Sequence, residues 1–192
     1  METNDYRYVD LGLPSGTLWA TCNVGAQKPT EHGLFFQWGD IIGYKPSDGK
    51  MFSWPNYKFY NIGNAYVTKY TATDKKKKLD LEDDAVHAHM GGDWRMPTRE
   101  QLEELLFYRE SFVSINKLGV NICRNKQNLF IPYAGYLRLN RHENCLTHAF
   151  IPSSNTGSLK THLSYAYLTS NNFGMWETVR CYGMPIRGVL NP

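Results

Sequence analysis

The sequence predicts an α+β fold in which two short helices precede a run of short antiparallel strands. Two stretches in the middle of the chain, residues 80–89 and 98–106, carry helix-start signals. Beyond Ser111, stretches rich in β-branched and aromatic residues alternate with Asn, Gly and Ser turns, and helices grouped before strands are typical of α+β domains. A chain of 192 residues can bury its own core, so we expect a single domain over residues 1–192, with a flexible tail at residues 1–5.

The first third of the chain predicts a β-hairpin and a covering loop. Residues 6–11 and 17–24 show strand patterns around a Leu-Pro-Ser-Gly turn, and residues 35–38 form a short aromatic strand that ends at Gly39. Residues 42–72 contain many aromatic and turn residues but neither a helical nor a strand period. A loop of this length usually packs on itself or carries function, so we expect a long excursion that lies over the core, held by its aromatic side chains.

Each expected helix has a capping signal. Asp80 is the expected N-cap of the first helix, which runs to His89, and the acidic residues after Asp80 favour the positive end of the helix dipole. Thr98 and Gln101 have the spacing of a capping box at the start of the second helix. The apolar stripe of that helix is Leu102, Leu105 and Leu106. The expected late strands are residues 129–132, 135–139, 147–151, 164–168, 174–179 and 185–190.

Charge and apolar patterning argue against two classes of partner. The net charge is +3, and the one dense basic run, at residues 75–78, is followed at once by acidic residues. A nucleic-acid surface needs positive charge spread along one face, so we expect no nucleic-acid partner. No apolar stretch approaches the roughly 18 residues of a membrane span, and residues 1–10 lack the basic and apolar regions of a signal peptide. We therefore expect cytoplasmic synthesis without a signal peptide in this chain and without membrane insertion.

Four cysteines, Cys22, Cys123, Cys145 and Cys181, are widely and irregularly spaced. They allow three disulfide pairings, among which sequence cannot choose. Because no two cysteines have CxxC spacing, we expect no structural zinc site, and we expect buried free thiols because Cys behaves as a small apolar residue in cores. The sequence thus predicts no metal site and no cofactor.

The composition changes in the late part of the chain. Residues 144–182 are rich in Ser, Asn, Thr, Tyr, Phe and Trp and carry almost no charge. This composition is typical of recognition surfaces, where Tyr and Trp provide rigid contact area and Ser and Asn provide adaptable hydrogen bonds. Tyr165 and Tyr167 alternate with Ala166 and Leu168, so one face of their strand should present both tyrosines. The candidate ligand-binding residues are Phe150, Asn155, Tyr165, Tyr167, Asn171, Asn172, Phe173, Trp176, Thr178, Arg180 and Tyr182.

A competing interpretation assigns the aromatic candidates to the core, because Tyr and Trp are intermediate in burial. The other tryptophans are expected in the scaffold, because each lies in a motif flanked by Gly or Pro turns. These scaffold tryptophans are Trp19, Trp38, Trp54 and Trp94.

Several motifs occur in a fixed order along nearly the whole chain. They are residues 8–20 (YVDLGLPSGTLWA), 23–26 (NVGA), 36–40 (FQWGD), 79–85 (LDLEDDA), 91–98 (GGDWRMPT), 131–136 (IPYAGY) and 182–187 (YGMPIR). In these motifs the chain resembles the Fibrobacter major paralogous domain family of gut Bacteroidetes and their phages. It departs from the family pattern mainly late, at residues 149–154 (AFIPSS) and at Gly188, and also at Leu81.

The resemblance implies a C-type-lectin-like fold, in which the N- and C-terminal strands pair and a long excursion carries the ligand face. Related domains are the variable proteins of diversity-generating retroelements, in which a hypermutated C-terminal segment changes what is bound. C-type lectins that bind sugar through calcium use Glu-Pro-Asn or Gln-Pro-Asp followed by Trp-Asn-Asp, and neither set of triplets occurs here. We therefore expect recognition without metal.

The same superfold includes the formylglycine-generating enzymes, which depend on a close cysteine pair near the C-terminus. Cys181 has no cysteine before it nearer than Cys145, and His142, His148 and His162 are expected to be surface or interface residues. We expect no enzyme, but a metal-independent receptor-recognition module, the variable binding protein of a gut phage or a bacterial adhesin, located on a virion or cell surface. Its partner would be a protein or glycan on a cell surface, and a homo-oligomer is compatible with this. The alternatives are an oxidase-like enzyme using Cys181 and a structural virion or fibre subunit.

Overall fold

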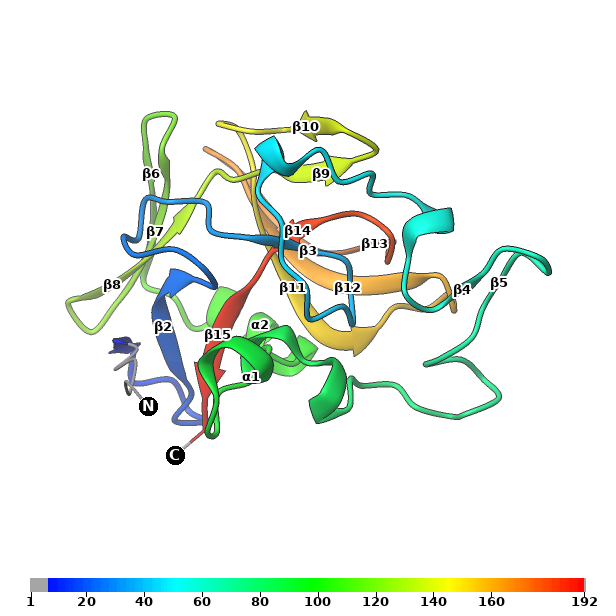
Figure 1. Cartoon of the computed structure of the whole chain (residues 1–192). Helices are drawn as coiled ribbons and strands as arrows, with labels where there is room; N and C mark the ends of the chain where they lie inside the picture. Colours follow the sequence, from blue (N-terminus) through cyan, green and yellow to red (C-terminus); the bar gives the residue numbers. More distant parts are fainter. Residues whose placement is uncertain (1–6, 192) are drawn as a thin grey trace.

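The computed structural model describes residues 7–191, and the predicted tail at residues 1–5 lies outside them. Within the described residues the fold is mixed, with two α-helices and many short strands in small antiparallel sheets, in agreement with the expected α+β class (Figure 1). The helices are α1 (Ala85–Met90) and α2 (Arg99–Phe107), with 3-10 turns at Pro46–Asp48, Trp54–Asn56 and Leu81–Asp83. The strands are β1 (Tyr8–Asp10), β2 (Leu18–Asn23), β3 (Phe35–Phe36), β4 (Tyr60–Asn61), β5 (Tyr66–Val67), β6 (Ser111–Ile115), β7 (Gly119–Arg124), β8 (Gln127–Pro132), β9 (Tyr136–Arg138), β10 (Arg141–Glu143), β11 (Ala149–Thr156), β12 (His162–Leu168), β13 (Phe173–Val179), β14 (Met184–Pro185) and β15 (Arg187–Leu190).

The first and last strands lie in one sheet. β2 pairs with both β1 and β15, so that the strand order is β1-β2-β15 (Figure 1). The predicted N-terminal hairpin is confirmed as β1 and β2, and its turn closes where the Gly16 N–H donates to the Leu13 carbonyl at 2.8 Å. Trp19 on β2 opposes Val189 on β15 and is fully buried, as expected of a scaffold residue.

The last predicted strand, residues 185–190, is divided between two sheets. β14 pairs with β3, whereas β15 pairs with β2. The register shifts between Arg187 and Val189, and the buried Arg187 guanidinium donates to the Ala20 carbonyl and to Asn23 Oδ1, each at 2.8 Å. The alternation of residues in the sequence cannot show that the strand changes its pairing partner, because a β-strand pattern continues through residues 185–190.

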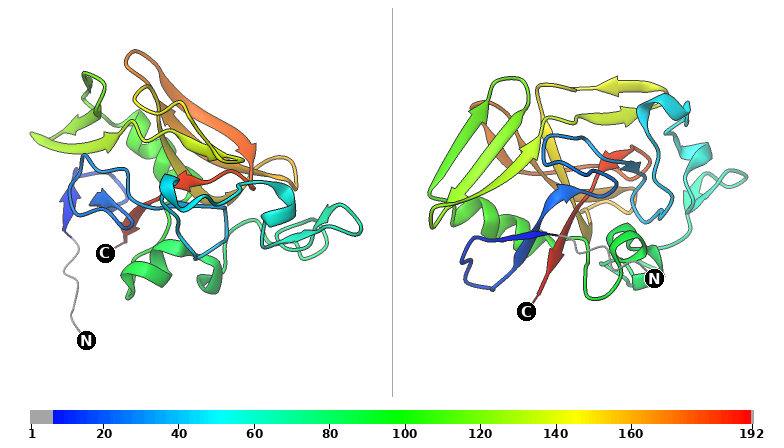
Figure 2. Two further views of the ribbon diagram at one scale, coloured as in Figure 1. Left: turned by 45° about the horizontal axis from the view of Figure 1, so that its top comes forward. Right: turned by 60° about the vertical axis from the view of Figure 1, so that its left-hand side comes forward.

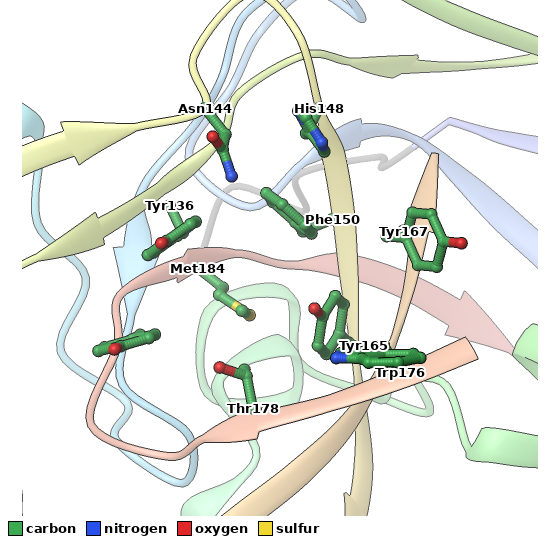
Figure 3. A pocket seen from close by; sticks show the side chains of 10 residues that line it. Tyr136, Asn144, His148, Phe150, Tyr165, Tyr167, Trp176, Thr178 and Met184 are labelled. Carbon is green, nitrogen blue, oxygen red and sulfur yellow. The ribbon is translucent and has the colours of Figure 1, made fainter. Parts of the chain in front are cut away.

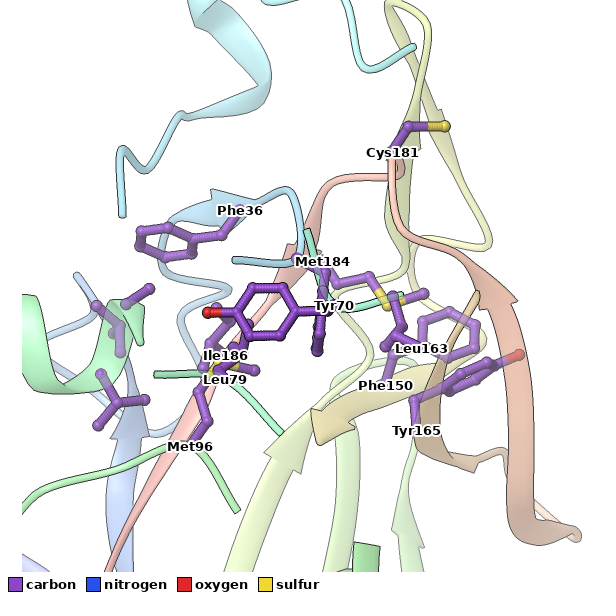
Figure 4. Packing of buried hydrophobic residues seen from close by; sticks show 14 of the residues in the cluster. Phe36, Tyr70, Leu79, Met96, Phe150, Leu163, Tyr165, Cys181, Met184 and Ile186 are labelled. Atoms are coloured by element: carbon purple, nitrogen blue, oxygen red, sulfur yellow. The ribbon is translucent and has the colours of Figure 1, made fainter. Parts of the chain in front are cut away.

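The segment of residues 42–72 covers the core, as predicted. It contains two 3-10 turns and the two-residue strands β4 and β5, and it buries four aromatic rings, those of Phe52, Tyr57, Phe59 and Tyr70. Three of them belong to the main apolar cluster, where Tyr70 lies near Leu79, Met184 and Ile186 (Figure 4). The segment is therefore held by aromatic burial and not by long strands or helices.

The first predicted helix begins later than expected. Asp80 precedes only a 3-10 turn and makes no capping hydrogen bond, whereas Asp84 caps α1 by accepting from the Val86 and His87 N–H groups. Asp84 also accepts from the Met96 N–H at 2.9 Å, across a loop of the chain. This third bond joins the helix start to the Trp94 motif, and local sequence does not show it.

The second helix matches its prediction. Thr98 Oγ1 accepts from the Gln101 N–H, and Gln101 Oε1 accepts from the Thr98 N–H at 2.8 Å, which completes the capping box. The leucine stripe of α2 is buried against the sheet of β11, β12 and β13. Neither α1 nor α2, the helices found in residues 7–191, has the length and apolarity that a membrane crossing requires.

Each predicted late strand overlaps an observed strand, whereas β6, β7 and β10 were not predicted. β6 and β7 pair over five positions and continue into β8 as a three-stranded sheet. Figure 2 shows this sheet at one end of the molecule and the β4–β5 hairpin at the opposite end. Gly119, at the start of β7, lies against the backbone of Ile131, where an added Cβ would come within 2.3 Å of the carbonyl oxygen. This close approach explains why Gly occupies the position.

The sheet β11-β12-β13 separates two environments. Ala149, Ile151, Ala166 and Leu168 point to one side, where they are fully buried against α2 and the β7–β8 strands. Phe150, Tyr165 and Tyr167 point to the opposite side, because side chains alternate along a strand. The second side is the one that carries the candidate site.

The acidic cluster that follows the lysine run is a structural ion network. Asp83 is buried and accepts from Lys58 Nζ and Lys69 Nζ, each at 2.6 Å, and from the Tyr70 hydroxyl. Lys69 also pairs with Glu82 and Asp80. The lysine ammonium groups neutralise the carboxylates, so the carboxylates can lie close together without strong mutual repulsion.

Candidate ligand-binding site

A hollow of about 340 Å³ opens on the outer side of the β11-β12-β13 sheet. Its walls come from β9, the segment that leads into β11, the three strands of the sheet and the approach to β14. The lining residues are Tyr136, Asn144, His148, Phe150, Tyr165, Tyr167, Trp176, Thr178, Tyr182 and Met184. Figure 3 shows Asn144 and His148 on one side of the hollow and Trp176 and Thr178 on the other.

Strand register places the sheet residues of the hollow on one face. Tyr165 opposes Trp176, and Tyr167 opposes Gly174, in the antiparallel β12–β13 ladder. Phe150 opposes Tyr167 on the other edge of β12. The predicted presentation of both tyrosines on one face is therefore confirmed, with Ala166 buried on the other.

The aromatic walls contact one another ring by ring. Tyr136 stacks on Tyr182 with ring centroids 5.2 Å apart and an angle of 21° between the ring planes. Phe150 makes edge contacts with Tyr136 and Tyr165, at centroid distances of 5.7 and 5.5 Å, and His148 stacks on Phe150 at 5.8 Å. Such contacts hold the ring orientations, so this part of the hollow is largely formed before any ligand arrives.

One large ring at the hollow is left open to solvent. Trp176 is 65% exposed, whereas Tyr165, directly opposite, is only 8% exposed. Tyr167 is half-buried, and its ring covers the Gly174 position, where an added Cβ would lie 3.2 Å from the ring. An exposed Trp beside packed aromatic rings is the kind of residue that dominates binding energy when it is covered by a partner.

The hollow has polar groups but little charge. None of its ten lining residues carries a carboxylate, an ammonium or a guanidinium group. Burial raises the pKa of Tyr165 to about 12, and burial followed by repulsion from Tyr182 raises the pKa of Tyr136. Burial lowers the pKa of His148, so its ring is neutral at pH 7. The site therefore offers hydroxyl, amide and imidazole groups to an uncharged or weakly charged ligand.

The structure brings six of the eleven predicted site residues into the hollow: Phe150, Tyr165, Tyr167, Trp176, Thr178 and Tyr182. Phe150 and Tyr165 are buried, as the competing core interpretation expects. Both residues nevertheless line the hollow. Asn171 and Asn172 are exposed in the β12–β13 turn, outside the lining. Phe173 packs instead on Phe112 and under the Arg109 guanidinium, 3.6 Å from the ring centre.

Two predicted site residues have internal structural roles. Arg180 is fully buried, lies 4.5 Å from the Trp38 ring centre and donates to the carbonyls of Lys69, Tyr70 and His162. It was predicted as a ligand contact, but backbone carbonyls of the covering segment and of β12 hold it inside the protein, away from the hollow. Asn155, on β11, contacts the first residue of α2: its Oδ1 accepts a hydrogen bond from the Arg99 N–H at 2.9 Å.

Sequence reasoning missed Tyr136, Asn144, His148 and Met184 as lining residues. Tyr136 belongs to a motif assigned to the scaffold, and His148 was expected at the surface or at an interface but was not among the predicted site residues. The available signal was the late composition change, which begins at Asn144, but composition does not indicate which residues converge.

The cysteines do not form a catalytic pair. All four are free, as expected, but only Cys181 is buried, and the other three are half-buried, which corrects the prediction of buried thiols. Burial raises the pKa of the Cys181 thiol to about 12. Its thiolate, the nucleophilic form, is therefore strongly disfavoured at neutral pH.

Comparisons of this chain with protein-family models, with curated proteins and with solved structures found no match. Function is therefore inferred from the hollow and from the motifs of the chain itself.

Proposed function

We propose that this protein is a ligand-binding module that recognises its partner without a metal contact, through the hollow on the β11-β12-β13 sheet. The observation that carries the proposal is the combination of a preformed aromatic wall with an exposed Trp176 at its edge. Binding surfaces concentrate their energy in such aromatic anchors, surrounded by adaptable polar groups.

The ligand class follows from the size and charge of the site. A volume of about 340 Å³ is at the small end of ligand pockets, which hold about 300–1,000 Å³. It suits one sugar ring or one or two protruding side chains of a protein. Aromatic faces with hydroxyl, amide and imidazole groups beside them fit either, so the proposed partner is a glycan or protein on a cell surface.

The proposal extends to fold and family. The pairing of β2 with β15, and the position of the hollow late in the chain, support a C-type-lectin-like fold. With the ordered motifs from residue 8 to residue 187, these features support membership of the Fibrobacter major paralogous domain family. The protein would then be the variable binding protein of a gut bacterial phage or a bacterial surface adhesin.

The enzyme alternative has less support, because the Cys181 thiol is buried and its pKa is raised. The assembly alternative, a virion or fibre subunit, would use the same aromatic surface as a contact between subunits. The two roles predict different effects of replacing Trp176. If Trp176 contacts another subunit, its replacement should dissociate the oligomer; if it contacts a receptor, the oligomeric state should not change.

Binding of labelled protein to a glycan array and to intact gut Bacteroidetes cells tests the proposal. Trp176→Ala should weaken binding by about 2 kcal/mol or more, as expected for an anchor. Tyr8→Ala is the matched control, because Tyr8 is 54% exposed on β1 and lies outside the hollow. Equal binding by wild type and Trp176→Ala would contradict the proposal, and an oligomer that dissociates in Trp176→Ala would favour the assembly role.

A further inference from the structure

A second group of side chains, outside the hollow, has the composition of a transition-metal site. His32, His142 and Cys145 each place one ligand atom so that the three atoms lie within 4.8 Å of one another. His32 comes from the β2–β3 connection, His142 from β10, and Cys145 from the segment between β10 and β11. All three side chains are half-buried.

The hydrogen bonding of His142 prepares one of its nitrogens for a metal. Nε2 lies 2.6 Å from the Ala134 carbonyl oxygen, which can only accept, so Nε2 carries the proton and donates it. Nδ1 is then the unprotonated nitrogen, with its lone pair directed away from Ala134. Ligating histidines in proteins usually hold the non-ligating N–H on a carbonyl in this way, which fixes both the tautomer and the ring orientation.

The backbone around the three residues is also anchored. The His32 carbonyl accepts from Asn23 Nδ2 at 2.9 Å, and Asn23 is itself bonded to the buried Arg187. Next to Cys145, the Leu146 N–H donates to the Tyr133 carbonyl at 2.8 Å. The His142 ring packs edge-on against Phe35 at 5.3 Å and against His32 at 5.9 Å. These contacts anchor the backbone and the His142 ring around the three ligand atoms.

Two imidazole nitrogens and one thiolate are borderline-to-soft ligands, which favour zinc over the hard ions calcium and magnesium. We propose that His32, His142 and Cys145 bind one Zn²⁺ ion, with the fourth tetrahedral position open to water. The oxygen-only group of Asp80, Glu82 and Asp83 is not equivalent, because its carboxylates are already paired with lysine ammonium groups.

The ion would have a positioning role beside the hollow. Its ligands are not among the residues that line the hollow, but Asn144, which does line it, is the neighbour of Cys145. Zinc would join the β2–β3 connection to the segment that carries Asn144 and His148, two regions about 110 residues apart in sequence. Zinc binding should accordingly be independent of the aromatic rings, so Trp176→Ala should bind zinc as the wild type does.

The test uses tag-free, chelator-stripped protein and zinc chloride, with calcium and magnesium chloride as comparison ions. Calorimetry should give one zinc per chain, and zinc at about 100 times its Kd should raise the melting temperature by roughly 5–10 °C. Cobalt should give a thiolate-to-metal absorption band, which reports sulfur ligation directly. Cys145→Ser should abolish the band and weaken zinc binding by about 10-fold or more.

Cys123→Ser is the matched control, because Cys123 is also free and half-buried but lies outside the cluster. It should keep the band and the zinc affinity, and His32→Ala should lose affinity as Cys145→Ser does. Absence of stoichiometric zinc binding by the wild type would overturn the proposal. So would zinc affinity that is unchanged in both Cys145→Ser and His32→Ala. These results are separable from a failure of ligand recognition, because they require no ligand of the hollow.

Discussion

Tyr165 and Trp176 oppose each other in the β12–β13 ladder, yet one is 8% exposed and the other 65% exposed. Both point to the same face of the sheet, so the difference does not come from strand alternation. Tyr165 is covered because Phe150, on the neighbouring strand β11, packs against its ring with the ring centroids 5.5 Å apart. A single cross-strand pair thus supplies the floor of the hollow and its exposed edge.

The two members of this pair should separate stability from recognition. Tyr165→Ala should lower the free energy of unfolding by about 3–5 kcal/mol, as for other buried aromatic rings. Trp176→Ala should change it by no more than about 0.5 kcal/mol, because the ring is mostly in water. Urea unfolding of both variants measures this, and similar losses for both would show that Trp176 is part of the core.

Trp94→Ala should be among the most destabilising scaffold changes. Trp94 is 8% exposed in the main apolar cluster and packs beside Gly188, where an added Cβ would lie 3.2 Å from the ring. The expected loss is about 3–5 kcal/mol, whereas Asn171→Ala, in the exposed β12–β13 turn, should stay within about 0.5 kcal/mol. Calorimetric melting of the two variants gives the comparison, and equal shifts would rule out the division into scaffold and surface.

Arg180→Ala should affect folding before it affects binding. The change removes the donors to three backbone carbonyls, one of them at a fully buried position, at a cost of about 2–3 kcal/mol. Arg138→Ala, at an exposed position near Tyr182, is the control and should cost no more than about 0.5 kcal/mol. A folded Arg180→Ala with unchanged melting temperature would show that the buried guanidinium is not structural.

Asp83 should make stability depend on pH in a defined direction. Burial alone would raise the pKa of Asp83, but hydrogen bonds from Lys58, Lys69 and Tyr70 outweigh it and the pKa is lowered. A carboxylate whose pKa is lowered by folding stabilises the protein above its unfolded-state pKa of about 3.9, and this stability is lost as pH falls through the folded-state pKa.

Wild type should therefore exceed Asp83→Asn by about 1–3 kcal/mol at pH 6–7, and the difference should shrink below about pH 4. Chemical unfolding of both proteins across this range measures it. Asp93→Asn, at an exposed position, should show no such difference. A gap between wild type and Asp83→Asn that widens toward low pH would contradict the assignment.

Short-range signals in the sequence were reliable where all of the interacting groups lie within a few residues. The capping box of Thr98 and Gln101 spans four residues, and the sequence shows it completely. The alternation of Tyr165 with Ala166 likewise predicted that the two side chains lie on opposite sides of β12, but it did not show that Tyr165 is buried too. The N-cap of α1 was misplaced at Asp80 because the choice of Asp84 also involves the Met96 N–H, twelve residues later.

The residues of the hollow and of the proposed zinc site also depend on contacts with residues that are distant in sequence. Arg180 and Tyr182 lie two residues apart in one stretch of low charge. The carbonyls of Lys69 and Tyr70 hold Arg180 inside, whereas Tyr136 stacks on Tyr182 at the hollow. His32 gave no sign of lying beside His142 and Cys145, since more than a hundred residues separate them.

Composition and local pattern alone determined the α+β class, the second helix, the approximate positions of most strands and the late segment in which the hollow is found. Tertiary structure alone decided which residues of that segment are buried and which distant residues complete the hollow and the proposed zinc site. The physical reason is that helix caps and strand faces depend on neighbours within a few positions. Burial and the convergence of side chains depend instead on surfaces that the chain brings together only on folding.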